Sequence, residues 1–325
     1  MDSPPAVCGG SAPARVGGHT VGVGDDIVGR PVNAVLAPPQ AERFAAVADV
    51  DPNRLVLNVT GWNKLVLLDF DRVFLFPRSA TGVEWFEREL AAYRALATTQ
   101  LGIVPRLLGC WEDPEIYPFP FAAVTRLRGK VPAEPEVLIE QLGRAIACWH
   151  ELEPPALAGA RPPRHHDTAH HRWLRRALDP ATSVGAAAEA ADLLGRPGRA
   201  PVWADLLASA AQLPHVLVHG DIHDGQLLAD GDRLTGIIDW ETARVDHPFW
   251  DFDLGQWGTG LWRRRRPGIS ALWARGWHAY AQARGLDVGS RPLETAFRLR
   301  HALRLLADPG DPAVDGTIEE HLAHL

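Results

Sequence analysis

The pattern of apolar and polar positions in the first third of the chain predicts a small antiparallel sheet. Short runs rich in Val, Leu and Phe are bounded by turn residues, which is typical of strands. The predicted strands cover residues 54–59, 64–68, 72–76, 107–111 and 121–127. Asp69-Phe70-Asp71 joins the second strand to the third as a hairpin connection, and a short helix at 41–50 precedes the sheet.

Helical spacing of apolar residues begins after the third strand and returns throughout the second half of the chain. Residues 83–96 have the apolar spacing of an amphipathic helix. Further helices are predicted over residues 136–152, 168–178, 185–194 and 202–213, and over the tail 269–325 with breaks at 285–287 and 308–310. Strands that enclose one helix, followed by a mainly helical region, predict an α+β fold with two lobes.

The same pattern suggests where the parts of the chain begin and end. Residues 1–30 are rich in Gly, Pro, Ser and Ala, which predicts a flexible N-terminal arm. Because Gly129 and Pro132 follow the last strand, we place an N-lobe at 31–127 and a C-lobe at 128–325. The Pro-, Arg-, His- and Ala-rich stretch 159–200 is expected to be an insertion over a substrate cleft.

Composition narrows the class of protein. A length of 325 residues is enough for two lobes with a sizeable core, and a net charge of −7 argues against nucleic acid as the main partner. The three cysteines, Cys8, Cys110 and Cys148, are scattered, which favours a reducing compartment. The opening residues lack the pattern of a signal peptide, and no apolar run is long enough for a membrane span. A cytoplasmic protein that does not bind membranes is therefore expected.

The candidate chemistry lies in two polar segments of the C-lobe. Asp221 follows the apolar run 216–218, Gln226 stands five positions later, and Asp239 closes another short apolar run. One carboxylate can orient and deprotonate an attacking hydroxyl, while an amide and a second carboxylate hold Mg²⁺ against nucleotide phosphates. Positioning and charge neutralisation dominate such chemistry. The two segments therefore indicate phosphoryl transfer.

The two segments read HGDIHDGQLL and IIDWE. They resemble the catalytic loop and metal segment of the aminoglycoside phosphotransferase and choline kinase-like superfamily, whose pattern is HGDxHxxN followed by IDxE/D. The resemblance implies a bilobal protein kinase-like fold, with a small antiparallel-sheet N-lobe and a larger, mainly helical C-lobe. It also implies a nucleotide between the lobes, ATP or GTP, whose γ-phosphate passes to a hydroxyl of a small-molecule substrate.

The resemblance implies roles for several polar residues of these segments. Asp221 is the catalytic carboxylate, and Asp239 and Gln226 are the ligands of Mg²⁺. Gln226 stands where the pattern has Asn, so its amide oxygen lies about 1.5 Å further out. The macrolide phosphotransferase branch also lacks this Asn and has Gly-His there. His219 is expected to brace the loop through main-chain hydrogen bonds. Asp251, in a segment similar to the family's DPxxDLA, is expected to support it.

The residues expected to bind the nucleotide depart further from the pattern of the family. There a Lys or Arg on the third strand grips the phosphates and pairs with a Glu of the following helix. Glu89 matches that Glu, but Leu75 occupies the position of the cation, so Lys64 or Arg78 is expected to supply the charge. The resemblance places the contact with the base near Thr125 and Leu127, through main-chain groups that do not distinguish ATP from GTP.

Two other classes of protein compete with the transferase. Leu75 and Gln226 are compatible with a nucleotide-binding pseudokinase or scaffold, but such a protein has no chemical need for both Asp221 and Asp239. The letters GDIH also resemble the GDxH box of a binuclear metallophosphoesterase, although the later boxes of that class, GDxxDR and GNH, do not appear. The acceptor stays open among an aminoglycoside, a macrolide and a metabolite.

Three further features have ambiguous patterns. The pairs 165–166 and 170–171 are histidines spaced as metal ligands can be, but a solvated segment is the favoured interpretation. The arginine run 263–266 is expected to form a solvated turn. The tryptophans at 240, 250, 257 and 262 are compatible with a substrate pocket and equally with core packing.

Overall fold

The computed structural model describes residues 36–58, 63–99, 101–153, 168–253, 268–287, 291–310, 314 and 316–325. The predicted arm 1–30 lies outside this range. The chain divides into two compact units, one formed by residues up to 97 with 105–127 and the other by 98–104 with 128–325. The short stretch 98–104 belongs to the second unit, where the Ile103 carbonyl accepts a hydrogen bond from Ile237 N at 2.8 Å.

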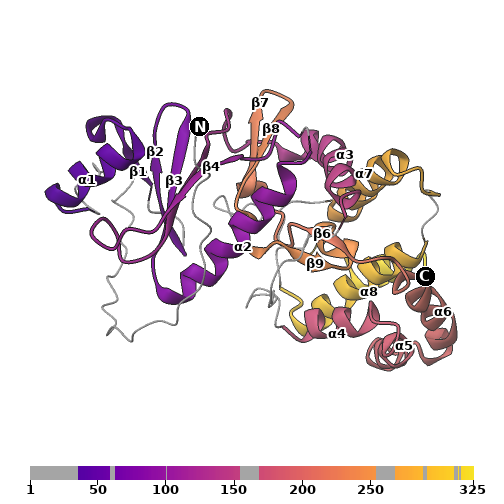
Figure 1. The fold of residues 1–325 in the computed structure, drawn as a ribbon. Helices are drawn as coiled ribbons and strands as arrows, with labels where there is room; N and C mark the ends of the chain where they lie inside the picture. Colours follow the sequence, from indigo (N-terminus) through magenta and orange to yellow (C-terminus); the bar gives the residue numbers. More distant parts are fainter. Residues whose placement is uncertain are drawn as a thin grey trace. The chain divides into compact units, whose positions relative to one another are not determined.

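The first unit is built on a five-stranded sheet with the order β1-β2-β3-β5-β4, in which every pair is antiparallel. Its strands are β1 (Val56–Asn58), β2 (Lys64–Leu68), β3 (Arg72–Pro77), β4 (Leu107–Trp111) and β5 (Phe121–Thr125) (Figure 1). All the predicted strands are present. The last one ends at Thr125 instead of Leu127 because the register with β3 stops there.

An aromatic core lies between the sheet and helix α1 (Pro38–Ala48). The Phe44 ring meets Phe74, Phe76 and Phe121 at centroid distances of 5.1, 5.6 and 5.7 Å, each time edge to face. Fully burying such a side chain contributes about 1.5–3 kcal/mol. Because side chains alternate along a strand, Phe74 and Phe76 point to this face and Leu75 points to the other.

Helix α2 (Ala80–Leu96) packs against β3 and β4. Ser79 caps its N-terminus, where the hydroxyl accepts from Gly82 N at 3.1 Å. The buried side chains recur at the three- and four-residue spacing of a helix, and the larger ones are Phe86, Glu89, Leu90, Tyr93 and Leu96. One of these, Glu89, carries a charge.

The second unit is mainly helical. Its α-helices are α3 (Ile139–His150), α4 (Ala169–Ala177), α5 (Ser183–Leu193), α6 (Ala200–Ala210), α7 (Ile269–Ala283), α8 (Arg291–Ala307) and α9 (Ile318–Leu322). Helix α3 packs along α7, α5 along α6, and α8 contacts both α6 and α9. The predicted helices are confirmed, including the two inside the stretch 159–200. No helix among the described residues is long and apolar enough to cross a membrane.

The close contact between α3 and α7 depends on glycine. A Cβ atom added to Gly143 would lie 2.2 Å from the carbonyl oxygen of Gly276 on the facing helix. Both residues are buried. The missing side chain therefore lets the two helix backbones approach.

Two small ribbons hold the predicted catalytic segments. Strand β6 (Val216–Val218) pairs with β9 (Arg244–Asp246), and β7 (Leu227–Asp230) pairs with β8 (Arg233–Ile237). The segment 219–226 connects β6 to β7 and is called the catalytic loop below. The segment 238–243 connects β8 to β9 and is called the metal segment. Both predicted segments therefore lie between short strands, as the apolar runs indicated.

Candidate active site

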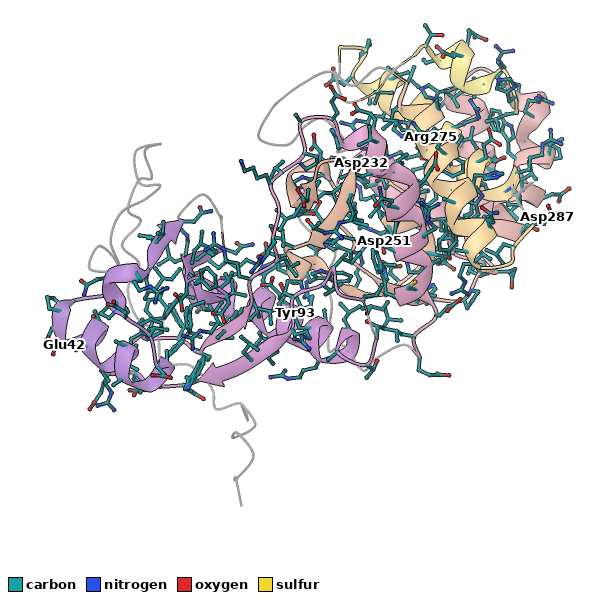
Figure 2. The ribbon with its side chains drawn as sticks, turned by 90° about the horizontal axis from the view of Figure 1, so that it is seen from above. Glu42, Tyr93, Asp232, Asp251, Arg275 and Asp287 are labelled. Carbon is teal, nitrogen blue, oxygen red and sulfur yellow. The ribbon has the colours of Figure 1, made fainter. Side chains whose placement is uncertain are left out.

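The backbone of the catalytic loop is fixed by one buried carboxylate. Asp251, which is 1% exposed, accepts hydrogen bonds from His219 N at 3.1 Å and from Gly220 N at 2.9 Å. Figure 2 shows it in the interior of the second unit. The expectation that Asp251 supports the catalytic loop is confirmed, and the support consists of main-chain hydrogen bonds.

Asp251 is itself held by two buried side chains, and a third supports one of them. Trp149 Nε1 donates to it at 2.8 Å and His150 Nε2 at 3.0 Å, while the Tyr280 hydroxyl donates to His150 Nδ1 at 3.1 Å. Burial alone would raise the pKa of Asp251, but the hydrogen bond from His150 holds it below its usual range. Burial lowers the pKa of His150 and raises that of Tyr280 to about 12. The result is an ionised carboxylate beneath the loop, held by neutral donors.

His219 ties the catalytic loop to the metal segment. Its ring Nε2 donates to the Ile238 carbonyl at 3.0 Å, and its own carbonyl accepts from the Thr242 hydroxyl at 2.6 Å. His219 is fully buried, and its ring lies 4.6 Å from that of Trp240. The predicted bracing role is therefore confirmed.

Asp221 stands at the start of the loop, directly after Gly220. Gly220 has φ +79, in the left-handed region that favours glycine. Further on, His223 Nδ1 accepts from Gly225 N at 3.0 Å and caps the short 3₁₀ turn Asp224–Gln226. His223 thus acts on the geometry of the loop. Asp221 itself is partly exposed. The backbone is held by hydrogen bonds before it, at Gly220, and after it, at Gly225.

Gln226 ends the 3₁₀ turn in a buried position. Its main chain is fixed: the amide donates to the His223 carbonyl at 3.0 Å, and the carbonyl accepts from Ile238 N at 3.0 Å. Its side chain is 4% exposed, and Oε1 has no hydrogen-bond partner among the described residues. Leaving a buried acceptor unpaired costs about 1–3 kcal/mol. An oxygen of this kind is suited to a ligand.

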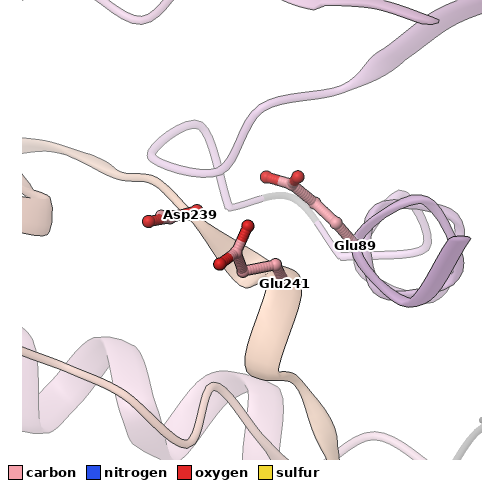
Figure 3. A group of neighbouring side chains, drawn as sticks. All are labelled: Glu89, Asp239 and Glu241. Carbon is pink, nitrogen blue, oxygen red and sulfur yellow. The ribbon is translucent and has the colours of Figure 1, made fainter. Parts of the chain in front are cut away.

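Asp239 has an unusual backbone conformation. Its φ of 70° puts a non-glycine residue in the left-handed region, immediately before the 3₁₀ turn Trp240–Thr242. Such a conformation costs about 1–3 kcal/mol and is found most often at functional sites. Trp240 anchors the turn through a hydrogen bond from Nε1 to the Ile237 carbonyl at 3.1 Å. Figure 3 shows Asp239 and Glu241 on this one segment.

The amide oxygen of Gln226 and the carboxylate of Asp239 fit a hard divalent cation. The hydrogen bond from Ile238 N to the Gln226 carbonyl joins the residue before Asp239 to the end of the catalytic loop. An amide oxygen and a carboxylate are the oxygen ligands that Mg²⁺ takes in proteins. The unpaired Gln226 Oε1 is the observation that favours this fit.

In the first unit, Lys64 and Glu89 form a buried ion pair. Lys64 Nζ lies 2.5 Å from Glu89 Oε2, and the Tyr93 hydroxyl donates to Glu89 Oε1 at 2.7 Å. Lys64 is 8% exposed and Glu89 is 1% exposed. Glu89 projects from α2 (Figure 3) and Lys64 from β2. A lysine on a strand is therefore held by a glutamate of the following helix.

The register of the sheet explains how Lys64 takes this place. Leu75 is buried and lies opposite Val66, and Lys64 lies two residues before Val66 on the same face. The lysine that pairs with Glu89 therefore lies on the strand next to that of Leu75. Arg78, the other predicted cation, is half-buried and donates from Nε to the Lys64 carbonyl at 3.2 Å. Burial lowers the pKa of Arg78.

The predicted contact with the base lies at the end of β5. Thr125 N donates to the Arg106 carbonyl at 2.9 Å, and its hydroxyl accepts from Arg106 N at 2.9 Å. The main-chain amide of Thr125 is therefore already used in the hydrogen bond to Arg106. Leu127 lies two residues beyond the last pair of the register with β3. Of the two predicted residues, Leu127 is better placed to offer main-chain groups.

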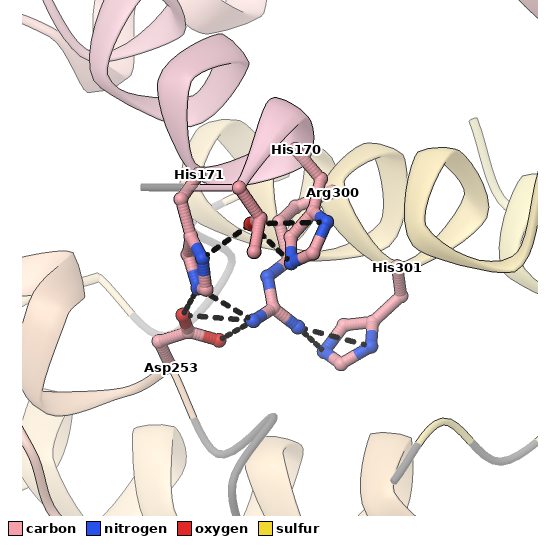
Figure 4. A network of polar contacts seen from close by, with 6 residues as sticks. His170, His171, Asp253, Arg300 and His301 are labelled. Atoms are coloured by element: carbon pink, nitrogen blue, oxygen red, sulfur yellow. Dashed lines mark hydrogen bonds and ion pairs between the residues drawn. The ribbon is translucent and has the colours of Figure 1, made fainter. Parts of the chain in front are cut away.

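The prediction of a solvated segment for His170 and His171 was wrong. His171 is 5% exposed on α4 and contacts Asp253, which forms an ion pair with the fully buried Arg300 of α8 at 3.0 Å. Figure 4 shows this network, which also includes His301. Burial lowers the pKa of His170 to about 3. Helix α4 places these rings against α8, where His171 is buried and His170 is half-buried.

The other ambiguous features divide between the core and the part of the chain that is not described. Trp240 and Trp250 are 0% and 3% exposed, so they are core residues. The histidines 165–166, the arginines 263–266 and the tryptophans at 257 and 262 lie outside the described residues.

Three residues around the catalytic loop were not predicted from the sequence: His150, Thr242 and Arg244. All are buried. His150 ends the amphipathic helix α3, and a polar residue on the apolar side of such a helix is a signal that could have indicated it. Thr242 and Arg244 lie in and after the metal segment, where nothing in the sequence pattern distinguishes them from solvent-facing residues.

Comparisons with known proteins concern the fold of the chain. The chain resembles an ADP-bound crystal structure of the aminoglycoside phosphotransferase APH(2'')-Ib, at 16% identity and a TM-score of 0.53, over 85% of this chain and 92% of that one. It also resembles the streptomycin-ATP complex of APH(2")-IIa, at 12% identity and a TM-score of 0.50, over 89% and 95% of the two chains. The apoenzyme of the macrolide 2'-phosphotransferase MphH from Brachybacterium faecium is similar at 21% identity and a TM-score of 0.49, over 89% and 98%.

At these identities the likeness shows the fold, which is α+β and bilobal, of the protein kinase-like type. No curated protein sequence matches the chain. The sequence profile of the phosphotransferase enzyme family matches residues 53–288, which include parts of both units and the whole of the catalytic loop and metal segment. The chain therefore belongs to the phosphotransferase enzyme family.

Proposed function

We propose that this protein transfers the γ-phosphoryl group of a nucleoside triphosphate to a hydroxyl group of a small molecule, as antibiotic kinases do. The observation that carries the proposal is the buried Gln226 Oε1, which has no hydrogen-bond partner among the described residues. It lies on a loop whose end is hydrogen-bonded to the residue before Asp239. A fixed loop that keeps one oxygen unpaired at a strained carboxylate segment is suited to a bound metal ion.

In this proposal Asp221 acts on the acceptor. Its carboxylate orients the hydroxyl and accepts the proton as the phosphoryl group leaves the nucleotide. Gln226 and Asp239 would hold Mg²⁺, which neutralises the negative charge of the phosphates when it is bound. Because Asp251 fixes the loop through two main-chain amides, Asp221 keeps its position while the charge distribution changes.

Lys64 is the residue that we assign to the phosphates of the nucleotide. Its ammonium group is oriented by Glu89, and Tyr93 supports Glu89 in turn. Arg78 is the second candidate for the same role. The Lys64–Glu89 pair favours Lys64 because a buried glutamate that orients a strand lysine is the arrangement that phosphoryl transfer uses in kinases.

For the acceptor we propose an aminoglycoside or a macrolide. The family membership supports an antibiotic kinase, and the replacement of Asn by Gln226 resembles the macrolide branch, which also lacks Asn. The similar structures are named as aminoglycoside and macrolide phosphotransferases. Representative compounds of both classes should therefore be screened, with ATP and with GTP as donors.

The first test is a thermal unfolding measurement with Mg²⁺ and ATP, and separately with Mg²⁺ and GTP. It compares the wild type with Asp239→Ala. A ligand at about a hundred times its dissociation constant adds roughly 2.7 kcal/mol to the free energy of unfolding. We expect a rise in the unfolding temperature that requires Mg²⁺ in the wild type and is lost in Asp239→Ala.

The exposed Asp232, in the turn between β7 and β8, supplies the control. Asp232→Ala removes the same charge and should keep the full shift. A nucleotide shift without transfer to any acceptor would favour the pseudokinase. No shift with either nucleotide in the wild type would refute the proposed function.

A further inference from the structure

A buried arginine lies directly against the catalytic loop. Arg244 opens β9 opposite Val218, the last residue of β6, and it is 2% exposed. A Cβ atom added to Gly220 would lie 2.2 Å from Arg244 Nη1 and 3.1 Å from Cζ. The guanidinium group therefore occupies the space that a side chain at Gly220 would fill, one residue before Asp221.

The guanidinium group is fixed from three directions. Nε donates to Asp246 Oδ2 at 2.6 Å, and Nη1 donates to the Thr242 carbonyl at 3.3 Å. Cζ lies over the ring of Trp250, 5.2 Å from its centroid. Nη2 is buried and has no hydrogen-bond partner among the described residues. Three contacts and the tight fit against Gly220 make this group a rigid surface.

The other contacts that hold the loop are hydrogen bonds, and they do not restrain the Cα atom of Gly220. Asp251 binds the amides of His219 and Gly220, and Thr242 binds the carbonyl of His219. None of these bonds holds the Cα of Gly220, whose φ of +79 lies in a region that glycine can leave easily. The guanidinium group is the contact that lies against this Cα, in the space that a side chain would fill.

We propose that Arg244 is a positioning residue for Asp221: its guanidinium group packs against Gly220 and keeps the catalytic carboxylate in place. This inference rests on the proposed function, because it assigns Asp221 to catalysis. Arginine suits the task since its planar group can lie flat against a backbone that has no side chain. A displacement of the reacting group by about 1 Å can lower the rate about a hundredfold.

The test replaces Arg244 and measures catalysis and loop motion separately. Arg244→Met keeps an unbranched side chain but removes the planar group, and Arg244→Lys keeps the charge. For both variants kcat and the KM for nucleotide are measured with the acceptor that the wild type uses. We expect kcat to fall about tenfold to a hundredfold in Arg244→Met and less in Arg244→Lys, with KM for nucleotide within about twofold.

Hydrogen exchange of the His219 and Gly220 amides supplies a readout that does not depend on activity. We expect exchange about tenfold faster in Arg244→Met than in the wild type, because the loop opens more often. Arg233→Met is the control: Arg233 is exposed on β8, so its loss should change neither kcat nor exchange.

The outcomes separate the inference from the proposed function. Unchanged kcat together with unchanged exchange in Arg244→Met would overturn the role of Arg244. If the wild type transfers no phosphate, the proposed function fails, and exchange alone decides whether Arg244 holds the loop. If Arg244→Met does not fold, Arg244→Lys decides: lower kcat at wild-type unfolding temperature supports the role, and wild-type kcat with wild-type exchange refutes it.

Discussion

Among single residues, two carboxylates of the second unit have opposite surroundings. Asp251 is buried, and its oxygens accept hydrogen bonds from main-chain amides and from Trp149 and His150. Asp221 lies partly exposed on the loop that Asp251 holds. Because the oxygens of Asp251 hold the loop amides, Asp251 is a support of the loop, and the proposed function assigns the chemistry to Asp221.

Asp221→Asn tests this division. The amide keeps the size of the side chain but cannot accept the proton of the acceptor hydroxyl. We therefore expect kcat to fall at least about a hundredfold, with nucleotide binding retained. Steady-state kinetics and a thermal shift with Mg²⁺ and nucleotide measure the two quantities. Wild-type turnover in Asp221→Asn would remove Asp221 from catalysis.

Mutation can decide whether Lys64 or Arg78 binds the phosphates of the nucleotide. Lys64→Met leaves Glu89 buried without its cation, so the free energy of unfolding should fall by about 3–5 kcal/mol. At a temperature where the variant stays folded, nucleotide binding should weaken about tenfold or more, because a charge-assisted hydrogen bond contributes about 1.5–3 kcal/mol. Titration calorimetry measures the affinity.

Arg78→Met is the matched variant for Lys64→Met. It removes a half-buried cation that donates to the Lys64 carbonyl, and we expect its nucleotide affinity to stay within about twofold of the wild type. A larger loss in Arg78→Met than in Lys64→Met would move the phosphate contact to Arg78.

Helix packing determines what lies beneath the catalytic loop. The hydrogen bond between Tyr280 of α7 and His150 of α3 joins two helices that touch through Gly143 and Gly276. His150 in turn contacts Asp251, and Asp251 holds the loop. A change in the distance between α3 and α7 therefore reaches the loop through these three hydrogen bonds.

Gly143→Ala tests this packing. Because the new Cβ would meet the carbonyl oxygen of Gly276, which is backbone, the helices must separate. We expect the free energy of unfolding to fall by about 1–3 kcal/mol, as measured by urea titration. Gly185→Ala is the control in α5: nothing lies within 4 Å of its Cβ position, so alanine should stabilise the helix by up to about 1 kcal/mol. Equal effects of the two changes would contradict the close approach.

The whole molecule carries several buried histidines with lowered pKa. Burial lowers the pKa of His247 to about 4 and that of His170 to about 3, and it holds the pKa of His301 well below its usual value. Figure 4 shows two of these rings in the network around Arg300. In the folded protein they stay neutral at a pH where the unfolded chain already binds protons.

Stability should therefore fall with acidity. Above pH 6.5, the usual histidine value, both states hold these rings neutral and the stability is complete. As the pH falls from 6.5 toward 4, the unfolded state binds more protons, and each such histidine removes up to about 1.4 kcal/mol per pH unit. Urea titrations between these values measure the slope.

His247→Asn should make this slope shallower, since asparagine can keep the cap that His247 Nδ1 provides to Phe249 N at 3.1 Å. Replacing the exposed His278 of α7 by Asn is the control, and it should leave the slope as it is in the wild type. An identical slope in His247→Asn and the wild type would show that His247 does not contribute.

The sequence by itself determined the elements and the two polar segments. Apolar spacing located each strand of the sheet and each helix of the second unit, because periodicity is local and follows from the geometry of the backbone. The polar residues 221, 226 and 239 stand next to short apolar runs, so the sequence also predicted that they lie on loops between short strands.

Only the tertiary structure decided which partner each buried polar group meets. Lys64 reaches Glu89 because the register of β2 and β3 puts it on the face of Leu75, and His150 reaches Asp251 across 101 residues of sequence. The sequence predicted a solvated position for His171, but the side chain is buried against Asp253. The pattern of apolar residues indicates which face of an element is covered. Which polar atoms come together under that cover depends on register and on helix packing, and these are properties of the folded chain as a whole.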